Sequence, residues 1–356
     1  MTPEPTTPEH RLPLVSVILP IRNEARHIGR TLRAVLGQNY PVERMEVIVA
    51  DGMSTDATRE IVRQWQAEHP RLRLIDNPAR IVPAGMNAAM GAARGAILVR
   101  IDGHCRIGPD HVRYCVARLE QDGVEGVGGP IRTVGHTLLG RTIAAAMSST
   151  FGVGGSTFRV GSREAIPVDT VPFPAYTAAL VRRAGPYDAT LACNEDDEYN
   201  YRLRKLGATL LLAPELESRY YCRGSLRALA RQYVRYGLWK VRVLQKHPRQ
   251  MQTRHFAPGL FIAVLVTCFA LAPWLTTARW LGAAAPAAYA TVALAASVAV
   301  AARHGWRMVG LLPIVFAVLH VSYGIGFLCG LVRFAPHWRN ELAEPRPWEG
   351  EAPAEP

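Results

Sequence analysis

One stretch of the chain, residues 257–332, is almost free of charge and limits how the whole chain can fold. It divides into three apolar segments, Ala257–Leu275, Leu281–Ala302 and Met308–Val332. Each segment is long enough to cross a hydrocarbon core of about 30 Å as a helix, although the alanine-rich second segment is the weakest. Tryptophans stand at the segment ends, where aromatic belts form: Trp274, Trp280 and Trp306. We therefore expect three transmembrane helices over 257–332.

The rest of the chain divides into a globular region and two tails. Residues 1–13 are rich in proline and threonine without an apolar core, so we expect a disordered tail and no signal peptide there. Residues 333–356 are rich in proline and glutamate and are also expected to be disordered. Residues 14–250 have the mixed composition of a single globular domain.

The charge of the chain indicates what it contacts. The formal net charge is +12 at pH 7, which suits either nucleic acid or an anionic membrane face together with phosphate groups in a site. The basic residues are densest over 219–254, directly before the apolar region, and this position favours the membrane. We expect a membrane contact and no nucleic acid. Six cysteines lie far apart without a CxxC pair, which indicates a reducing cytoplasm.

Short apolar runs alternate with stretches of helical spacing in the first hundred residues. The expected strands are Val15–Pro20, Glu46–Asp51, Leu72–Asn77 and Ala96–Asp102, and the expected helices are Ala25–Gly37, Thr55–His69 and Pro83–Gly95. This alternation predicts an α/β domain in which a mostly parallel sheet has helices on both faces. Ligands of such sheets bind at the carboxyl ends of the strands, and polar segments follow three of the four expected strands.

Two of these polar segments contain candidate ligand-binding side chains. Asp51, in the segment DGMSTD, can accept hydrogen bonds from a nucleobase or a ribose, although a capped turn explains the segment equally well. Asp102 and His104 stand two apart across a turn and can both bind a divalent cation that bridges the phosphates of a nucleotide sugar. A plain hydrogen-bonded turn is the alternative. The histidine softens the site, so Mn²⁺ suits it as well as Mg²⁺.

Two further motifs lie on expected helices. Four consecutive acids, Glu195–Glu198, open a helix whose dipole favours acids there, but capping requires only one or two. Their mutual repulsion raises the pKa of at least one, which suits a general base. Residues 225–246 form a basic amphipathic helix that either lies in a membrane interface or packs on the preceding domain. Gln232 and Arg235 share a face of it, and Arg235 is suited to bind pyrophosphate.

The order of these motifs resembles the inverting glycosyltransferases of family 2, which have the GT-A fold. The motifs run from Pro20-Ile21-Arg22-Asn23-Glu24 through DGMSTD, DGH and EDDEYNYRLR to QYVRY, and the resemblance extends from about Val15 to Pro248. The stretches TVPFPAY, DDEYNYRLRKLG and QYVRYGLWKVRVLQKHPRQ are similar to bacterial exopolysaccharide glucosyltransferases of the succinoglycan type.

The resemblance implies a role for each matching residue. The implied nucleotide-sugar-binding residues are Pro20, Glu24, Asp51, Asp102, Gln232 and Arg235. Asp102 would touch the ribose or the metal, and His104 would ligate the metal. Asp196 would be the catalytic base that deprotonates the acceptor hydroxyl. Tyr236 replaces the tryptophan of the Gln-x-x-Arg-Trp motif of processive synthases, a departure that argues against processivity.

The resemblance also implies a reaction and a location. A sugar, glucose in the most similar enzymes, would pass from a UDP-sugar to a membrane-bound, polyprenyl-linked saccharide in exopolysaccharide or cell-envelope glycan synthesis, with Mg²⁺ or Mn²⁺ as cofactor. A polyprenyl-phosphate glycosyltransferase, a processive polysaccharide synthase and a non-catalytic nucleotide-binding membrane protein are the alternatives. The implied location is the bacterial inner membrane, multi-pass, with the catalytic domain facing the cytoplasm. Three crossings would, however, place the basic residues after 332 outside, against the positive-inside rule.

Overall fold

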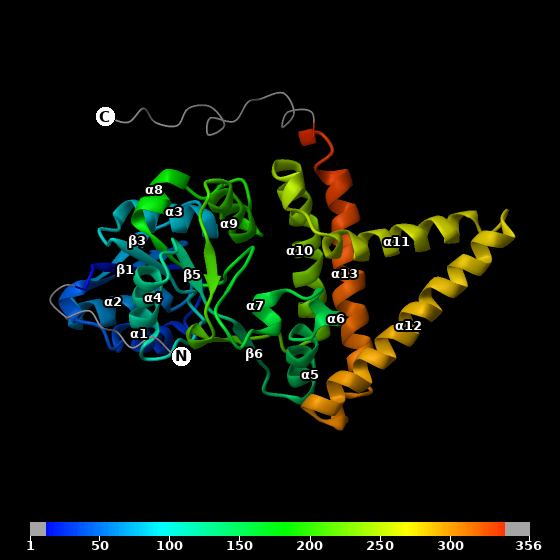
Figure 1. Ribbon diagram of the computed structural model, residues 1–356, viewed down its shortest axis with the longest axis horizontal. Helices are drawn as coiled ribbons and strands as arrows, with labels where there is room; N and C mark the ends of the chain where they lie inside the picture. Colours follow the sequence, from blue (N-terminus) through cyan, green and yellow to red (C-terminus); the bar gives the residue numbers. More distant parts are fainter. Residues whose placement is uncertain (1–11, 339–356) are drawn as a thin grey trace.

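The computed structural model describes residues 12–338 (Figure 1). An α/β domain contains the first two thirds of the chain, and four long helices stand beside it. The predicted fold class is confirmed, because the domain has a mostly parallel sheet and is followed by apolar helices.

The sheet has eight strands in the order β3-β2-β1-β4-β8-β5-β9-β7. The first four strands in that order are parallel, β8 runs antiparallel to both of its neighbours, and β7 runs antiparallel to β9. The strands are β1 (Val15–Ile21), β2 (Met45–Asp51), β3 (Leu72–Asp76), β4 (Ile97–Arg100), β5 (Gly126–Gly128), β7 (Ile166–Pro167), β8 (Ala175–Thr177) and β9 (Leu210–Leu212). The strand order reverses beside β1, between β2 and β4, and such a switch point opens a crevice at the carboxyl ends of the strands.

Helices cover both faces of this sheet, as predicted. Alternate residues of β1 serve two cores: Val17 and Leu19 face one, and Ile18 faces the other. The first core includes α1 (Ile28–Leu36), α2 (Thr58–Glu68) and α4 (His111–Gln121). The second includes α3 (Val82–Ala92), α8 (Ala178–Ala184) and α9 (Glu195–Lys205). The four predicted strands and three predicted helices are all present, with ends that differ by at most three residues.

A smaller layer lies between the sheet and the long helices. Strands β6 (Ile131–Val134) and β10 (Ser218–Tyr221) pair in parallel. Three helices follow β6, namely α5 (Leu138–Met147), α6 (Thr150–Val153) and α7 (Thr157–Val160). Figure 1 shows α5, α6 and α7 between the sheet and α13.

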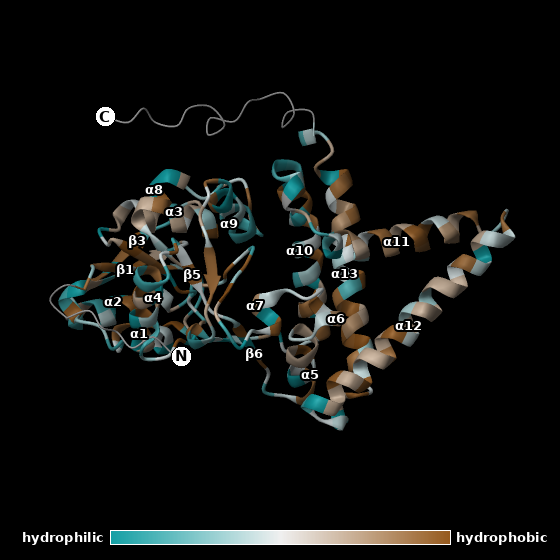
Figure 2. Cartoon of the chain, in the orientation of Figure 1, coloured by the Kyte–Doolittle hydropathy of each residue, from teal (hydrophilic) through white to brown (hydrophobic). Residues whose placement is uncertain are grey.

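The long helices are α10 (Leu226–Lys246), α11 (Thr253–Leu271), α12 (Thr276–His304) and α13 (Leu312–Arg333). Helices α11, α12 and α13 are long and apolar enough to cross a membrane, and Figure 2 shows their largely apolar colouring beside the mixed surface of α10. Helix α13 packs on α10, and glycines permit the close approach. A Cβ on Gly237 would overlap the Tyr323 carbonyl oxygen, and one on Gly326 would overlap that of Val234.

The two expected tails lie mostly outside the described residues, which exclude 1–11 and 339–356. Their inner ends are packed, so both boundaries need correction. Leu12 is buried in the first core, and the Pro13 carbonyl accepts a hydrogen bond from the Tyr40 hydroxyl at 2.6 Å. Phe334 is also buried, and its carbonyl oxygen accepts a hydrogen bond of 2.8 Å from Gln245 on α10.

Candidate active site

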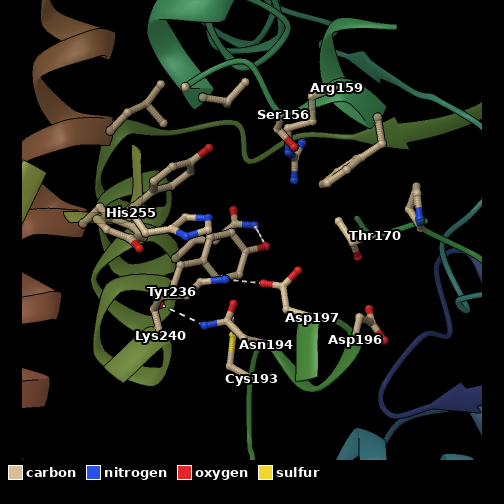
Figure 3. Close-up of a pocket in the computed structure, with 18 of the residues that line it drawn as sticks. Ser156, Arg159, Thr170, Cys193, Asn194, Asp196, Asp197, Tyr236, Lys240 and His255 are labelled. Carbon is tan, nitrogen blue, oxygen red and sulfur yellow. Dashed lines mark hydrogen bonds and ion pairs between the residues drawn. The ribbon is translucent and has the colours of Figure 1, made fainter. Parts of the chain in front are cut away.

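A cavity of about 1220 Å³ separates the α/β domain from the long helices. Its wall on the domain side contains the end of β4 and the start of α9, and its opposite wall contains residues of α10, α11, α12 and α13. Figure 3 shows Asp196 and Asp197 at the start of α9, with Asp197 directed towards Lys240 of α10. Asp102, His104, Asp196, Gln232 and Arg235, five of the predicted site residues, line it together.

The start of α9 is fixed to α10 by the residue before the four acids. Asn194 has φ 61°, in the left-handed region that asparagine tolerates better than most residues. Its side-chain amide donates a hydrogen bond of 3.0 Å to the Tyr236 carbonyl oxygen. The turn therefore places the first acids of α9 at the cavity.

Arg100, the last residue of β4, joins three carboxylates of the site. Its guanidinium lies 3.0 Å from Asp102 Oδ1, 3.6 Å from Glu195 Oε1 and in close contact with Asp196 Oδ1. The Arg100 side chain is only 6% exposed, so this cation is held inside the protein by its acidic partners.

Each of the four acids has a basic partner, which explains why four occur in succession. Glu195 and Asp196 share Arg100, and Asp197 pairs with Lys240 of α10. Glu198 is almost fully buried and accepts two hydrogen bonds of 3.0 Å from Arg202. The reading of the acids as a simple helix cap is therefore insufficient.

The pairs affect the acids differently. Desolvation is the largest influence on Asp196, and it raises the pKa of this carboxyl to about 8 against the opposing effect of Arg100; the acids Glu195 and Asp102 raise it further. The Asp196 side chain is still 38% exposed, so an acceptor in the cavity can reach it. Desolvation also acts on Asp197, but Lys240 reverses the net effect and lowers the pKa of that carboxyl. The raised pKa of Asp196 agrees in direction with the sequence prediction, but its largest cause is desolvation, and repulsion by the neighbouring acids is a smaller one.

A second, smaller cavity of about 160 Å³ adjoins the first at the carboxyl ends of β1 and β4. Pro20, Glu24, Asp102 and His104 all line it, so four predicted residues meet there. Glu24 Oε1 lies 2.8 Å from His104 Nδ1, and this hydrogen bond raises the pKa of the imidazole. A carboxylate on one ring nitrogen is the arrangement that orients a metal-binding histidine through its other nitrogen.

Asp51 is the predicted residue that the structure places away from both cavities. Its side chain is fully buried and forms an ion pair of 2.7 Å with Arg59. The Ser54 amide also donates a hydrogen bond of 2.9 Å to Asp51 Oδ2. The neighbouring Gly52, however, lines the smaller cavity. Asp51 thus shapes the turn after β2 through Ser54 and Arg59.

The two predicted residues of α10 face the large cavity. The Gln232 amide lies 2.8 Å from the Tyr236 hydroxyl and 3.2 Å from that of Tyr220. Arg235 donates a hydrogen bond to the carbonyl oxygen of Ala192, in the segment just before α9. Tyr236, which replaces the tryptophan of the synthase motif, therefore orients Gln232.

A metal ion would need ligands beyond the protein. Among residues 12–338, no group of three or more His, Cys, Asp or Glu side chains is arranged to hold one. Asp102 and His104 nevertheless line the same two cavities and offer one oxygen and one nitrogen ligand. This donor set fits Mg²⁺ or Mn²⁺ bound mainly through substrate phosphates, because these ions are commonly held by one or two protein carboxylates together with phosphate and water.

Sequence reasoning missed several residues of the site. Arg100 had a visible signal, since it is a charged residue at the end of an apolar run and two positions before Asp102. Lys240 was one of many basic residues on its helix. Arg159 and Arg254 line the large cavity from segments that carry no recognisable motif.

Comparisons with known proteins agree with this geometry. The sequence profile described as glycosyl transferase family 2 matches residues 16–184. The chain is 29% identical over 324 residues to succinoglycan biosynthesis protein ExoA of Rhizobium meliloti. This match covers 89% of this chain and 95% of that protein. It is 27% identical over 240 residues, 65% of this chain and 74% of the relative, to dolichyl N-acetyl-alpha-D-glucosaminyl phosphate 3-beta-D-2,3-diacetamido-2,3-dideoxy-beta-D-glucuronosyltransferase of Methanococcus voltae.

A solved structure shares the fold. It is the mannosyltransferase PcManGT from Pyrobaculum calidifontis in complex with GDP-Man and Mn²⁺, with a TM-score of 0.58 and 21% sequence identity. The match covers 92% of this chain and 89% of that one. The similarity therefore includes the long helices as well as the α/β domain.

Proposed function

We propose that this glycosyltransferase, whose residues 16–184 form a glycosyl transferase family 2 domain, transfers a sugar from a UDP-sugar to a lipid-linked saccharide with inversion at the anomeric carbon. Glucose is the proposed sugar. The observation that carries the proposal is the position of Asp196, an accessible carboxyl of raised pKa in a cavity that also holds Asp102 and His104.

Asp196 is the proposed base of a direct displacement. Its carboxylate takes the proton of the acceptor hydroxyl, whose oxygen attacks the anomeric carbon as the bond to the nucleoside diphosphate breaks. A base with a pKa near the working pH combines sufficient basicity with a useful ionised fraction. Arg100 keeps the carboxylate in place through its contact with Asp196 Oδ1.

The smaller cavity is the proposed nucleoside end of the donor site, lined by Pro20, Glu24, Asp102 and His104. Asp51 supports that end from within the β2 turn, while Gln232 and Arg235 face the large cavity where the diphosphate would leave. Asp102 and His104 would hold a divalent cation, and Glu24 orients the histidine. When bound, such a cation neutralises charge on the departing phosphates.

The acceptor side of the proposal rests on the far wall of the large cavity. Phe261, Tyr289 and Leu319, from three apolar helices, line it along with Asp196. A saccharide attached to a membrane lipid could therefore reach the base from the membrane side. The name of the relative from Methanococcus voltae also describes a dolichyl-linked sugar phosphate as its acceptor.

The proposed location is the bacterial inner membrane, with the α/β domain facing the cytoplasm. Three helices that are long and apolar enough to cross a membrane support this location. Basic residues precede the first of these helices, and the positive-inside rule places such residues on the cytoplasmic side.

A panel of nucleotide sugars tests this function. The full-length protein in membranes is supplied with lipid extract as acceptor, and release of nucleoside diphosphate is measured for each donor. We expect release from UDP-glucose only when lipid extract is present. Absence of release with every donor would contradict the proposed reaction, and release from a GDP-sugar alone would contradict the donor.

A further inference from the structure

One nitrogen of a half-buried guanidinium that lines the large cavity has no hydrogen-bond partner among the described residues. Arg159 belongs to α7, and its Nη1 atom is inaccessible to solvent and has no hydrogen-bond partner among residues 12–338. The guanidinium carbon lies 5.3 Å from the centre of the Phe158 ring, so it is held over an aromatic face. Figure 3 shows Arg159 reaching into the cavity from the wall opposite Asp197 and Lys240.

Three other cations that line the cavity are paired with carboxylates. Arg100 contacts three carboxylates, Lys240 pairs with Asp197, and Arg254 pairs with Asp169 at 3.2 Å. Arg159 differs because its buried Nη1 atom has no acceptor among the described residues. A guanidinium only donates hydrogen bonds, and a buried charged donor without an acceptor is costly. Its complement is an anionic oxygen supplied by a ligand.

A second unsatisfied donor points to the same ligand. The hydroxyl of Tyr323, on α13, also lines this cavity, is buried and lacks a partner among the described residues. Tyr323 comes from an apolar helix, whereas Arg159 comes from the globular part. A ligand that satisfies both must therefore reach from α13 to the domain.

We propose that Arg159 and Tyr323 bind the phosphate that links the acceptor saccharide to its lipid. This proposal rests on the function proposed above and names the part of the acceptor that the protein recognises. The apolar side chains of Phe261 and Leu319 line the same cavity and would accommodate the first part of the lipid chain. A planar guanidinium is well matched to phosphate oxygens.

Binding of farnesyl diphosphate to the full-length protein in detergent tests the proposal. Saturating UDP is present throughout to occupy the donor site, and farnesol and inorganic pyrophosphate are the comparison probes. We expect farnesyl diphosphate to bind more tightly than either. Arg159→Met should weaken its binding about tenfold or more, Tyr323→Phe should weaken it roughly threefold, and Arg159→Lys should restore part of the loss.

Arg163→Met is the matched control, because Arg163 is exposed and lies outside the cavity lining. It should bind like the wild type. A parallel titration is made without UDP. Binding of farnesyl diphosphate that is seen only there, and that saturating UDP abolishes, would assign Arg159 to the donor diphosphate and overturn the proposal. Equal binding of farnesol or of inorganic pyrophosphate, or no effect of Arg159→Met, would also overturn it. Because no sugar transfer is measured, failure of the proposed function would be seen separately, in the donor panel.

A different observation concerns how the helices meet the membrane. Helices α10 and α13 run side by side (Figure 1), and α10 carries six basic residues: Arg227, Arg231, Arg235, Lys240, Arg242 and Lys246. A helix with so many charges is not stable in hydrocarbon. Glycines hold α13 against it, since a Cβ on Gly326 would overlap the Val234 carbonyl oxygen. Helix α13 must therefore lie at the same depth relative to the membrane as α10.

In contrast to α10, helices α11 and α12 are apolar and largely exposed. Their far ends project away from α10 and α13 and meet there (Figure 1), while the middle of α12 contacts α13 through Tyr289 and His320. Each helix has only 17% of its most apolar stretch buried. Helix α11 is about 28 Å long at the usual rise per residue, enough to cross most of a bilayer. Trp274 and Trp280, at the far ends, are 77% and 72% exposed, as expected at a membrane interface.

We infer that α11 and α12 form a transmembrane hairpin, while α13 lies in the cytoplasmic interface beside α10. The near ends of the hairpin carry Arg254 and Arg303, and Arg307 follows α12, whereas the far end carries Arg279. This distribution follows the positive-inside rule. Two crossings return the chain to the cytoplasm and remove the conflict that three crossings create for the basic residues after α13.

Cysteine labelling in intact cells tests the hairpin. In a full-length chain whose six cysteines are replaced by serine, Leu275→Cys, Gly310→Cys and Ala335→Cys each provide one exposed site. A membrane-impermeant maleimide should label Leu275→Cys from outside and label the other two only after permeabilisation. External labelling of Ala335→Cys would mean that α13 crosses the membrane, and a protected Leu275→Cys would mean that the hairpin does not.

Discussion

Replacing Arg100 by methionine should change both the stability and the pH dependence of the protein. The Arg100 side chain is 6% exposed, and the side chains of its partners Glu195, Asp102 and Asp196 are 12%, 24% and 38% exposed. An exposed ion pair contributes less than about 1 kcal/mol, and breaking a buried one costs about 3–5 kcal/mol. The partial exposure of the acids places the expected cost of Arg100→Met at about 2–3 kcal/mol.

Arg100→Met should also shift the pH dependence of turnover in a definite direction. Arg100 opposes the rise in the pKa of Asp196, so its removal raises that pKa further. A base must be ionised to act, and the acidic limb of the pH–turnover profile should therefore move to higher pH. A partly screened interaction of about 1–2 kcal/mol corresponds to about one pH unit. Turnover at neutral pH should fall roughly tenfold from this shift alone.

Arg118→Met is the matched control. Arg118 also pairs with two carboxylates, Glu215 and Asp122, and is 14% exposed, but it lines neither cavity. Thermal unfolding and turnover between pH 6 and pH 9 are measured for both variants. The two should lose comparable stability, and only Arg100→Met should shift the profile. An unshifted profile in Arg100→Met would refute the electrostatic account of the site.

Three further outcomes follow from the same structure. Excess chelator should abolish turnover and Mn²⁺ or Mg²⁺ should restore it, while Asp102→Ala should be inactive yet folded; full turnover in chelator would exclude the metal role of Asp102 and His104. The full-length protein should remain in the membrane pellet after a high-salt wash and require detergent for release, and release by salt alone would leave α10 as the sole attachment. At pH 8 the free energy of unfolding of Asp196→Asn should exceed that of the wild type by about 1 kcal/mol after allowance for exposure, so the variant should melt at a higher temperature. The reason is that a raised carboxyl pKa makes folding less favourable as pH rises from 3.8 towards 8. Equal melting temperatures of the two proteins at pH 8 would disagree with the raised pKa.

The sheet was predictable because its first half is built from local patterns. Apolar runs such as 15–20 and 46–51 are short and rich in β-branched residues, which favours strands, and the helices between them are amphipathic. The later strands are only two to four residues long and pair out of chain order, with β8 inserted antiparallel between β4 and β5. Such short segments carry almost no periodicity, so their pairing could not be read from the sequence.

The site was predictable to the extent that its residues belong to motifs. Asp102, His104 and Asp196 meet at one cavity, as their motif order suggested. The pairing of Asp197 with Lys240 joins residues 43 positions apart, and no local pattern reveals which of many basic side chains reaches an acid. Asp51 shows the converse, since its motif indicated a ligand contact, but the fold turns the carboxylate inward to Arg59.

The central claim is that Asp196 is the base, and one comparison tests it most directly. Turnover and UDP affinity are measured separately for Asp196→Asn and Asp197→Asn in the full-length protein. Asp196→Asn should lower turnover by at least about 10²-fold, the usual scale of general base catalysis, with UDP affinity unchanged because the base meets the acceptor. Asp197→Asn should be milder in turnover, since its carboxylate is held by Lys240. An inactive Asp197→Asn beside an active Asp196→Asn would assign the base to Asp197, and full activity in both would place the base elsewhere.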